Sequence, residues 1–171
     1  MKNAEIPILG FAAFSGTGKT TLLTKLIPLL KQTGLRIALI KHSHHNFEID
    51  KPGKDSYRLR EAGASPVMLV SSHRRAMITE FDSIQEPKLS DQLKILDQSE
   101  LDLILVEGFK AENFPKIELH RPSLNYPLIF PNDPSVIAIA TDSTVSDSGS
   151  LPHLDINDPQ LISHFIINAF L

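Results

Sequence analysis

Residues 13–21, Ala-Phe-Ser-Gly-Thr-Gly-Lys-Thr-Thr, have the types and the spacing needed to bind a chain of phosphates. An apolar run at 6–14 precedes the glycines and a helical pattern follows them, which is the strand–loop–helix order of a phosphate-binding loop. Gly16 and Gly18 allow the backbone to wrap closely around an anion, where a Cβ atom would clash. Successive N–H groups then point inward and form an anion-binding nest at the start of a helix.

The side chains of this loop have expected roles in binding a nucleotide with Mg²⁺. Lys19 is expected to reach the β- and γ-phosphates and to act in catalysis, and the Thr20 hydroxyl is expected to ligate Mg²⁺. The other predicted nucleotide-binding residues are Ser15, Gly16, Thr17, Gly18 and Thr21. The match to G-x-x-x-x-G-K-[ST] is incomplete, since Ala13 stands at the first position, where a small residue is mostly what is needed.

Two acidic residues come directly after apolar runs that we predict to be parallel strands. Ligands bind at the carboxyl ends of such strands. Glu107 ends the run 103–106, so we predict that it holds Mg²⁺ directly or through water and takes part in catalysis. Asp142 follows the run 136–140, and a carboxylate there can accept both guanine donors, N1–H and the 2-amino group. The full N-K-x-D guanine motif is absent, so a turn-forming aspartate is the alternative.

Residues 41–65 form an unusually polar segment that follows the predicted strand 35–40. We predict a switch-like loop that brings Asp50 near the magnesium ion or its waters as a third catalytic residue; a solvated loop before a surface helix is the alternative. His42, His44 and His45 suggest a Zn²⁺ or Ni²⁺ site. Histidines in a loop are more often hydrogen-bonded or in contact with anions.

The hydrophobic periodicity predicts one α/β domain over residues 1–171: a P-loop NTPase fold with a mostly parallel central sheet flanked by helices, and a β-rich extension around 111–135. Expected helices cover about 22–34, 55–63 and 87–96, with a last helix capped by Asn157 or Asp158. Strands are expected at 66–71 and 74–81, and a half-exposed strand at 114–120. The proline-rich stretch 120–135 is expected to be extended, and 146–153 a loop.

Composition narrows the class of protein. The formal net charge is −3, which implies no general attraction to nucleic acid or to anionic membranes. The absence of cysteine excludes disulfides and thiolate metal sites and fits a reducing compartment. We expect neither a signal peptide nor a membrane span, and a cytoplasmic location.

Four stretches together resemble one family, the molybdopterin-guanine dinucleotide biosynthesis adaptor proteins (MobB): 14–23, 40–64, 101–110 and, more weakly, 154–158. The resemblance implies a GTP-binding homodimer with weak GTPase activity and bound Mg²⁺. It implies partnership with the guanylyltransferase (MobA) that joins GMP to molybdopterin, and it leaves molybdopterin open as a further ligand. By matching motifs, Gly16, Gly18, Lys19 and Thr20 would bind phosphates and Mg²⁺, and Glu107 would serve magnesium. Residues 42–55 would be the family's distinctive ligand or partner surface.

Two other classes share a phosphate-binding loop. A small-molecule kinase would also need an acceptor pocket and an arginine-bearing lid, and no lid segment has convincing spacing. A metallochaperone GTPase would use His42 and His44, although the lack of cysteine weighs against it. In each case we expect at most slow, Mg-dependent hydrolysis, because no glutamine or arginine is clearly placed to orient water or to neutralise charge in the transition state.

Overall fold

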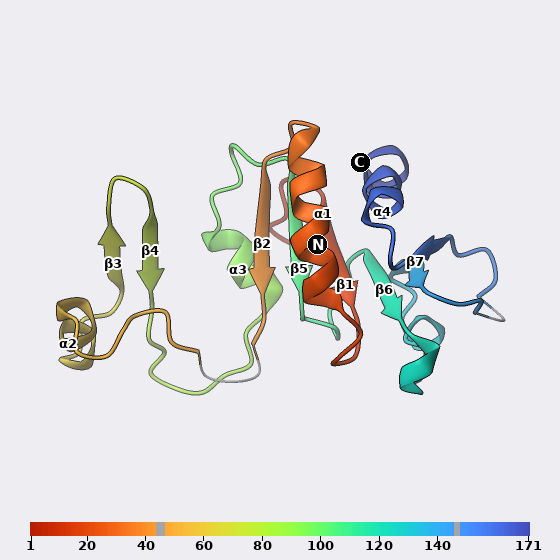
Figure 1. Cartoon of the computed structure of the whole chain (residues 1–171). Coiled ribbons are helices and arrows are strands. Elements are labelled where there is room, and N and C mark those ends of the chain that lie inside the picture. The colour runs from red at the N-terminus through yellow and green to blue at the C-terminus, as the bar shows by residue number, and fades with distance from the viewer. Residues whose placement is uncertain (44–46, 146–147) are drawn as a thin grey trace. The chain divides into compact units, whose positions relative to one another are not determined.

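The computed structural model describes residues 1–43, 47–145 and 148–171 (Figure 1). The chain forms two compact units. The first unit comprises Met1–His42 and Pro87–Leu171, and the second comprises Ser43–Glu86. The phosphate-binding loop, Glu107 and Asp142 belong to the first unit, whereas Asp50 belongs to the second.

A six-stranded sheet forms the centre of the first unit, in the order β2-β5-β1-β6-β7-β8. Every neighbouring pair in it is parallel, and the arrows of β2 and β6 both point downward in Figure 1. The mostly parallel central sheet predicted from the sequence is thereby confirmed. Its strands are β1 (Ile8–Ala12), β2 (Ile37–Lys41), β5 (Leu103–Glu107), β6 (Lys116–His120), β7 (Val136–Thr141) and β8 (His153–Asp155).

Helices cover both faces of this sheet. On one face α1 (Lys19–Gln32) and α4 (Pro159–Phe165) bury leucine and isoleucine side chains against alternate residues of the strands. On the other face α3 (Leu89–Ile95) buries Leu89 and Leu93 against Ile104 and Val106 of β5. The central strand β5 is therefore apolar on both sides, as is typical of a parallel sheet enclosed by helices.

The strand β6 corrects the sequence analysis, which expected 114–120 to be half-exposed. All five of its residues are buried, including Lys116, Glu118 and His120. Glu118 accepts hydrogen bonds from the backbone N–H groups of Ile129 and Phe130, both at 2.8 Å. The alternation of polar and apolar residues identified the two faces of the strand correctly, but the segment that follows covers the polar face.

That covering segment, 121–135, is also less extended than expected. It contains two 3₁₀ turns, Pro122–Leu124 and Phe130–Asn132, each with proline in its first positions. The Lys116 ammonium group donates to the Glu112 carbonyl (2.6 Å), the Asp133 carboxylate (2.9 Å) and the Ser135 hydroxyl (2.7 Å). Burial raises the pKa of Asp133, but hydrogen bonds from Ser135 and Lys116 outweigh it, so the net shift is downward. Burial raises the pKa of Glu118 against the effect of its two backbone donors.

At the C-terminal end of the chain the structure corrects the predicted loop and confirms a predicted helix cap. His153 begins the short strand β8, so the end of the predicted loop 146–153 is part of the sheet. Asp158 caps α4 as predicted, because its carboxylate accepts from the N–H groups of Gln160 and Leu161. The helical chain then continues as a π-helical turn, Ile166–Phe170. None of the helices in the described part of the chain is long and apolar enough to cross a membrane.

The second unit consists of α2 (Asp55–Glu61) and the antiparallel pair β3 (Val67–Val70) and β4 (Arg75–Ile78). Arg60 joins the helix to its surroundings: its guanidinium pairs with Glu80 and Glu48 and stacks over the Tyr57 ring. The paired residues Met68 and Met77 are both exposed, as is Val70. One exposed face of this hairpin is therefore mostly apolar, with Arg75 opposite Val70 on the same face.

Gly10 in β1 generates a prediction about packing. A Cβ atom at this position would lie 2.6 Å from Cε2 of Phe114 and 3.0 Å from Cγ of Lys116, both buried. We expect Gly10→Ala to destabilise the protein by about 1–3 kcal/mol, because a packed ring must move to admit the methyl group. A double-mutant cycle compares the wild type, Gly10→Ala, Phe114→Leu and the double variant by chemical denaturation. The coupling between the two substitutions should be at least about 0.5 kcal/mol. Additive effects would mean that the aromatic ring is not what requires glycine there.

Candidate functional site

The phosphate-binding loop joins β1 to α1 and has the backbone conformation that its glycines predict. Gly16 and Gly18 have φ angles of +80° and +97°, in the left-handed region that side chains disfavour. Gly18 is the N-cap of α1, so the free N–H groups at the start of the helix face the loop. The buried Thr17 holds the loop closed, because its hydroxyl donates to the Phe14 carbonyl at 2.9 Å.

Glu107, at the end of β5, faces the loop lysine. One of its carboxylate oxygens lies 3.6 Å from Nζ of Lys19, and the other lies 3.4 Å from Nζ of Lys41, the last residue of β2. The Glu107 side chain is only 14% exposed, so this group of charges is partly shielded from water. The structure thus brings together two of the predicted catalytic residues, Lys19 and Glu107, and adds Lys41 from the neighbouring strand.

Arg121, directly after β6, connects three parts of the site. Its Nε donates to the Thr17 carbonyl at 3.0 Å, one terminal nitrogen pairs with Asp142, and the other donates to the Asn157 side chain at 2.9 Å. Asp142, predicted to read guanine, is thereby connected to the phosphate-binding loop. The sequence analysis did not single out Arg121. The rule that identified Glu107 and Asp142, a polar residue at the carboxyl end of a predicted strand, applies to it equally.

A small cavity of about 210 Å³ lies against one side of the loop. Gly16, Gly18 and Thr21 form one wall, and Arg121 and Asn157 lie across from them. The volume is below the range of about 300–1,000 Å³ that is usual for a whole small-molecule site. The cavity therefore has room for one part of a ligand whose remainder lies over the open loop.

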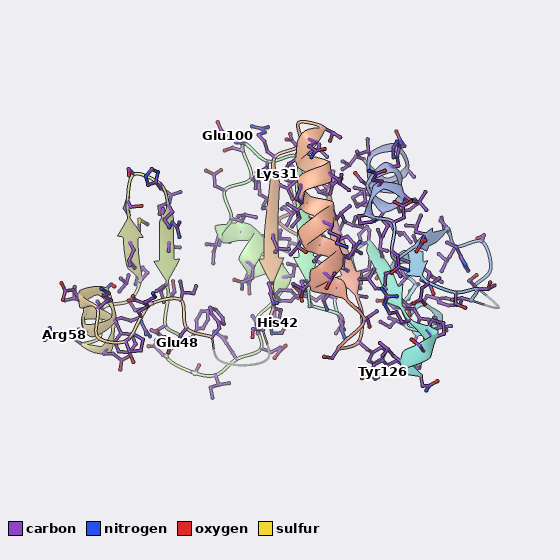
Figure 2. All side chains as sticks on the ribbon, in the orientation of Figure 1. Lys31, His42, Glu48, Arg58, Glu100 and Tyr126 are labelled. Carbon is purple, nitrogen blue, oxygen red and sulfur yellow. The ribbon has the colours of Figure 1, made fainter. Side chains whose placement is uncertain are left out.

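The other side of the loop borders a cavity of about 690 Å³. Phe14 and Lys110 line this cavity, and Nζ of Lys110 lies 5.2 Å from the centre of the Phe14 ring. The Phe14 ring also stacks on that of Tyr126, with 4.6 Å between centroids. Burial, followed by the charge of Lys19, lowers the pKa of Lys110. Figure 2 shows Tyr126 and His42 at the same end of the sheet, where the strands point, with Lys31 and Glu100 at the opposite end.

Two further predictions concern Asp50 and His42, and the backbone N–H of His42 donates to the Glu107 carbonyl at 2.8 Å. Asp50 lies in the second unit, where its Oδ1 accepts from the Lys51 N–H (2.9 Å) and the Ser56 hydroxyl (3.0 Å). The His42 ring stacks on Phe109 at 4.7 Å, whereas His44 and His45 lie outside the described residues. Within residues 1–43, 47–145 and 148–171, no group of three or more histidine or acidic side chains is arranged to hold a metal ion. The catalytic role of Asp50 stays a prediction.

Comparison with known proteins identifies the family. Residues 8–142 match the family model described as molybdopterin guanine dinucleotide synthesis protein B, MobB. The molybdopterin-guanine dinucleotide biosynthesis adapter protein of Escherichia coli K12 is 48% identical over 95% of this chain and 92% of its own length. The protein of the same name from Haemophilus influenzae is 47% identical over 97% of this chain and 90% of its own length. The chain therefore belongs to the MobB family.

Solved structures agree on the fold. The crystal structure of Bacillus subtilis MobB superposes with a TM-score of 0.73 at 22% identity, covering 95% of this chain and 96% of that one. A structure titled molybdopterin-guanine biosynthesis protein B gives a TM-score of 0.69 at 24% identity, covering 94% of this chain and 97% of that one. The mostly parallel sheet flanked by helices is thus the fold of the family.

The position of Arg121 predicts a local stabilising role. We expect Arg121→Met to lower the free energy of unfolding by about 1–3 kcal/mol, because three charge-assisted hydrogen bonds are lost together. Arg36→Met is the matched control: Arg36 also pairs with an aspartate, Asp102, but at the opposite end of the strands and with more of the pair exposed. Exposed pairs contribute little, so the control should lose less. Equal losses in urea denaturation would contradict the bridging role of Arg121.

Proposed function

We propose that this MobB-family protein binds GTP with Mg²⁺ at the carboxyl edge of its central sheet and acts as an accessory in the attachment of GMP to molybdopterin. The observation that carries the proposal is the phosphate-binding loop with Lys19 held against Glu107. The names of its relatives, which are adapter proteins of molybdopterin-guanine dinucleotide biosynthesis, support the pathway.

The loop supports binding of a triphosphate. Its two left-handed glycines and the start of α1 present backbone donors to an anion, and Lys19 adds a charge beside them. Ser15, Gly16, Thr17, Gly18, Thr20 and Thr21 would line the phosphates. The donor set also fits Mg²⁺, which prefers oxygen ligands: the Thr20 hydroxyl is exposed at the first turn, and the Glu107 carboxylate lies within 3.6 Å of Lys19. The metal would neutralise charge on the phosphates.

The small cavity beside Arg121 supports a place for the base. It lies between the loop and Asn157, and Arg121 connects it to Asp142. A carboxylate has about four lone-pair positions, so Asp142 can accept from Arg121 and from guanine together. Adenine offers no matching pair of donors, so Asp142 would favour guanine.

Slow hydrolysis fits the same geometry. The Nε and both terminal nitrogens of Arg121 are already bonded to Thr17, Asp142 and Asn157. A guanidinium held in this way has two N–H donors left and cannot move toward a γ-phosphate without giving up these bonds. Neutralising charge there contributes a factor of about 10³–10⁵ in GTP-hydrolysing proteins. We therefore propose that the protein holds and presents GTP in the cytoplasm to a guanylyltransferase of the MobA type, rather than turning it over rapidly.

Discrimination between GTP and ATP tests this proposal. Calorimetric titration with Mg²⁺ should show selective binding of GTP, because only guanine satisfies Asp142. Asp142→Asn should weaken GTP binding by about ten- to a hundredfold and leave ATP binding unchanged. The control Lys19→Ala should weaken binding of both nucleotides by about a hundredfold or more with the fold intact. Retained GTP affinity in Lys19→Ala, or equal binding of GTP and ATP by the wild type, would refute the site as proposed.

A homodimer is the second part of the proposal, and the β3–β4 hairpin supports it. Met68, Val70 and Met77 lie on one exposed face of the hairpin, with Val70 72% exposed. An apolar face of this kind on so small a unit is typical of a protein interface. We propose that a second copy of the chain covers it.

Sedimentation velocity tests the dimer directly. Val70→Lys should convert a dimeric protein to monomers at micromolar concentration, because a buried unpaired charge at an interface costs several kcal/mol. Ile95→Lys is the matched control, since Ile95 is 66% exposed but lies on α3 in the first unit. A wild-type protein that sediments as a monomer, or a monomer produced equally by both variants, would contradict this assignment.

A further inference from the structure

The larger cavity beside the phosphate-binding loop has the size of a ligand site. Its volume of about 690 Å³ falls within the range of about 300–1,000 Å³ usual for small-molecule pockets. Phe14 and Lys110 lie at its border with the loop, and residues 127–129 and 132–134 form the opposite wall. The nucleotide proposed above would use the other side of the loop, next to Arg121 and Asn157.

One cation at this cavity, Lys110, is available to an anion. Two carboxylates also border the cavity: Asp133 pairs with Lys116 and accepts from Ser135, and Glu112 accepts from the Leu89 N–H at 2.7 Å. In the part of the chain that the structure describes, Lys110 has no carboxylate within ion-pair distance, and the Phe14 ring is its neighbour. Lys110 is exposed, so an anionic group of a ligand can reach it without displacing a protein carboxylate.

The walls of the cavity favour a flat ring. The Phe14 ring borders the cavity next to Lys110, and Tyr126, which does not line the cavity, supports it by stacking at an interplanar angle of 10°. Pro127, Leu128 and Ile129 supply apolar surface on the far side. An aromatic wall with one cation at its edge suits a planar heterocycle that carries a phosphate.

We infer that this cavity is a second ligand site, which holds a phosphorylated pterin beside the nucleotide, with Lys110 on its phosphate and the Phe14–Tyr126 stack against its ring. The inference rests on the proposed function, because molybdopterin is the pterin phosphate that GMP is joined to in that role. The two cavities share no lining residue, so the pterin and the guanine base would lie in separate places beside the loop.

Fluorescence titration with neopterin monophosphate tests the site, with the full-length protein held in saturating GDP and Mg²⁺. We expect the probe to bind, and unphosphorylated neopterin to bind at least about tenfold more weakly, because a charge-assisted contact to phosphate is lost. GMP under the same conditions is the competing probe. Binding of GMP that depends on Lys110 would overturn the assignment to a pterin and identify a second nucleotide site.

Variants locate the binding. Lys110→Ala should lose at least about tenfold in affinity for the pterin phosphate, and Tyr126→Leu about two- to tenfold, since the aromatic wall loses its support. Lys94→Ala, an exposed lysine on α3, is the control and should bind as the wild type does. An unchanged affinity in Lys110→Ala, or an equal loss in Lys94→Ala, would overturn the inference.

GTP titration of the same proteins separates the two proposals. If the wild type binds GTP but not the pterin phosphate, the second site is refuted and the nucleotide site stands. If the wild type binds the pterin phosphate through Lys110 but binds no nucleotide, the nucleotide proposal is refuted and the cavity assignment stands. Competition between GTP and the pterin phosphate for one site would also refute two separate sites.

Discussion

The parallel pairing of β1 with both β5 and β6 is the constraint on which the rest of the site depends. Phe11 pairs in register with Glu107 of β5, and Ala12 with Glu118 of β6, so the three strands end at nearly the same level. The chain leaves each strand at one edge of the sheet, and the residues that follow are forced together. Lys19 and Glu107 are 88 positions apart in the sequence, yet their charged groups lie 3.6 Å apart.

This edge carries more positive charge than the whole protein suggests. The formal net charge of the chain is −3, yet among the described residues the ion pairs of Lys19, Lys41 and Arg121 at this edge are with two carboxylates, Glu107 and Asp142. Lys19 and Lys41 share Glu107, and Lys110 has no carboxylate partner among the described residues. A local excess of cations that is partly shielded from water attracts anions far more strongly than the net charge indicates. The edge of the sheet is therefore suited to hold several phosphate groups at once.

Much of this architecture could be predicted from the sequence, because local patterns determine it. The glycine spacing of 16–18 identified the loop, the continuous apolar run 103–106 identified the central strand, and Asp158 identified the cap of α4. What failed depends on contacts between distant segments. Alternation in 114–120 showed which side chains share a face, but whether Lys116 and Glu118 are buried is decided by residues 121–135. The residues around Arg121 do not indicate that its side chain bonds to Thr17 and Asn157, since these lie 104 and 36 positions away in the sequence.

The covering segment also explains why the larger cavity exists. Parallel strands are usually joined by a helix, whose side chains fill the space over the sheet. Between β6 and β7 the chain instead crosses in two 3₁₀ turns. Two side chains of β6 fix this segment to the sheet: Glu118 accepts from two of its backbone N–H groups, and Lys116 pairs with Asp133. These few polar anchors hold the segment without filling the space beneath it. The buried charges of β6 thus help to position the segment that borders the larger cavity.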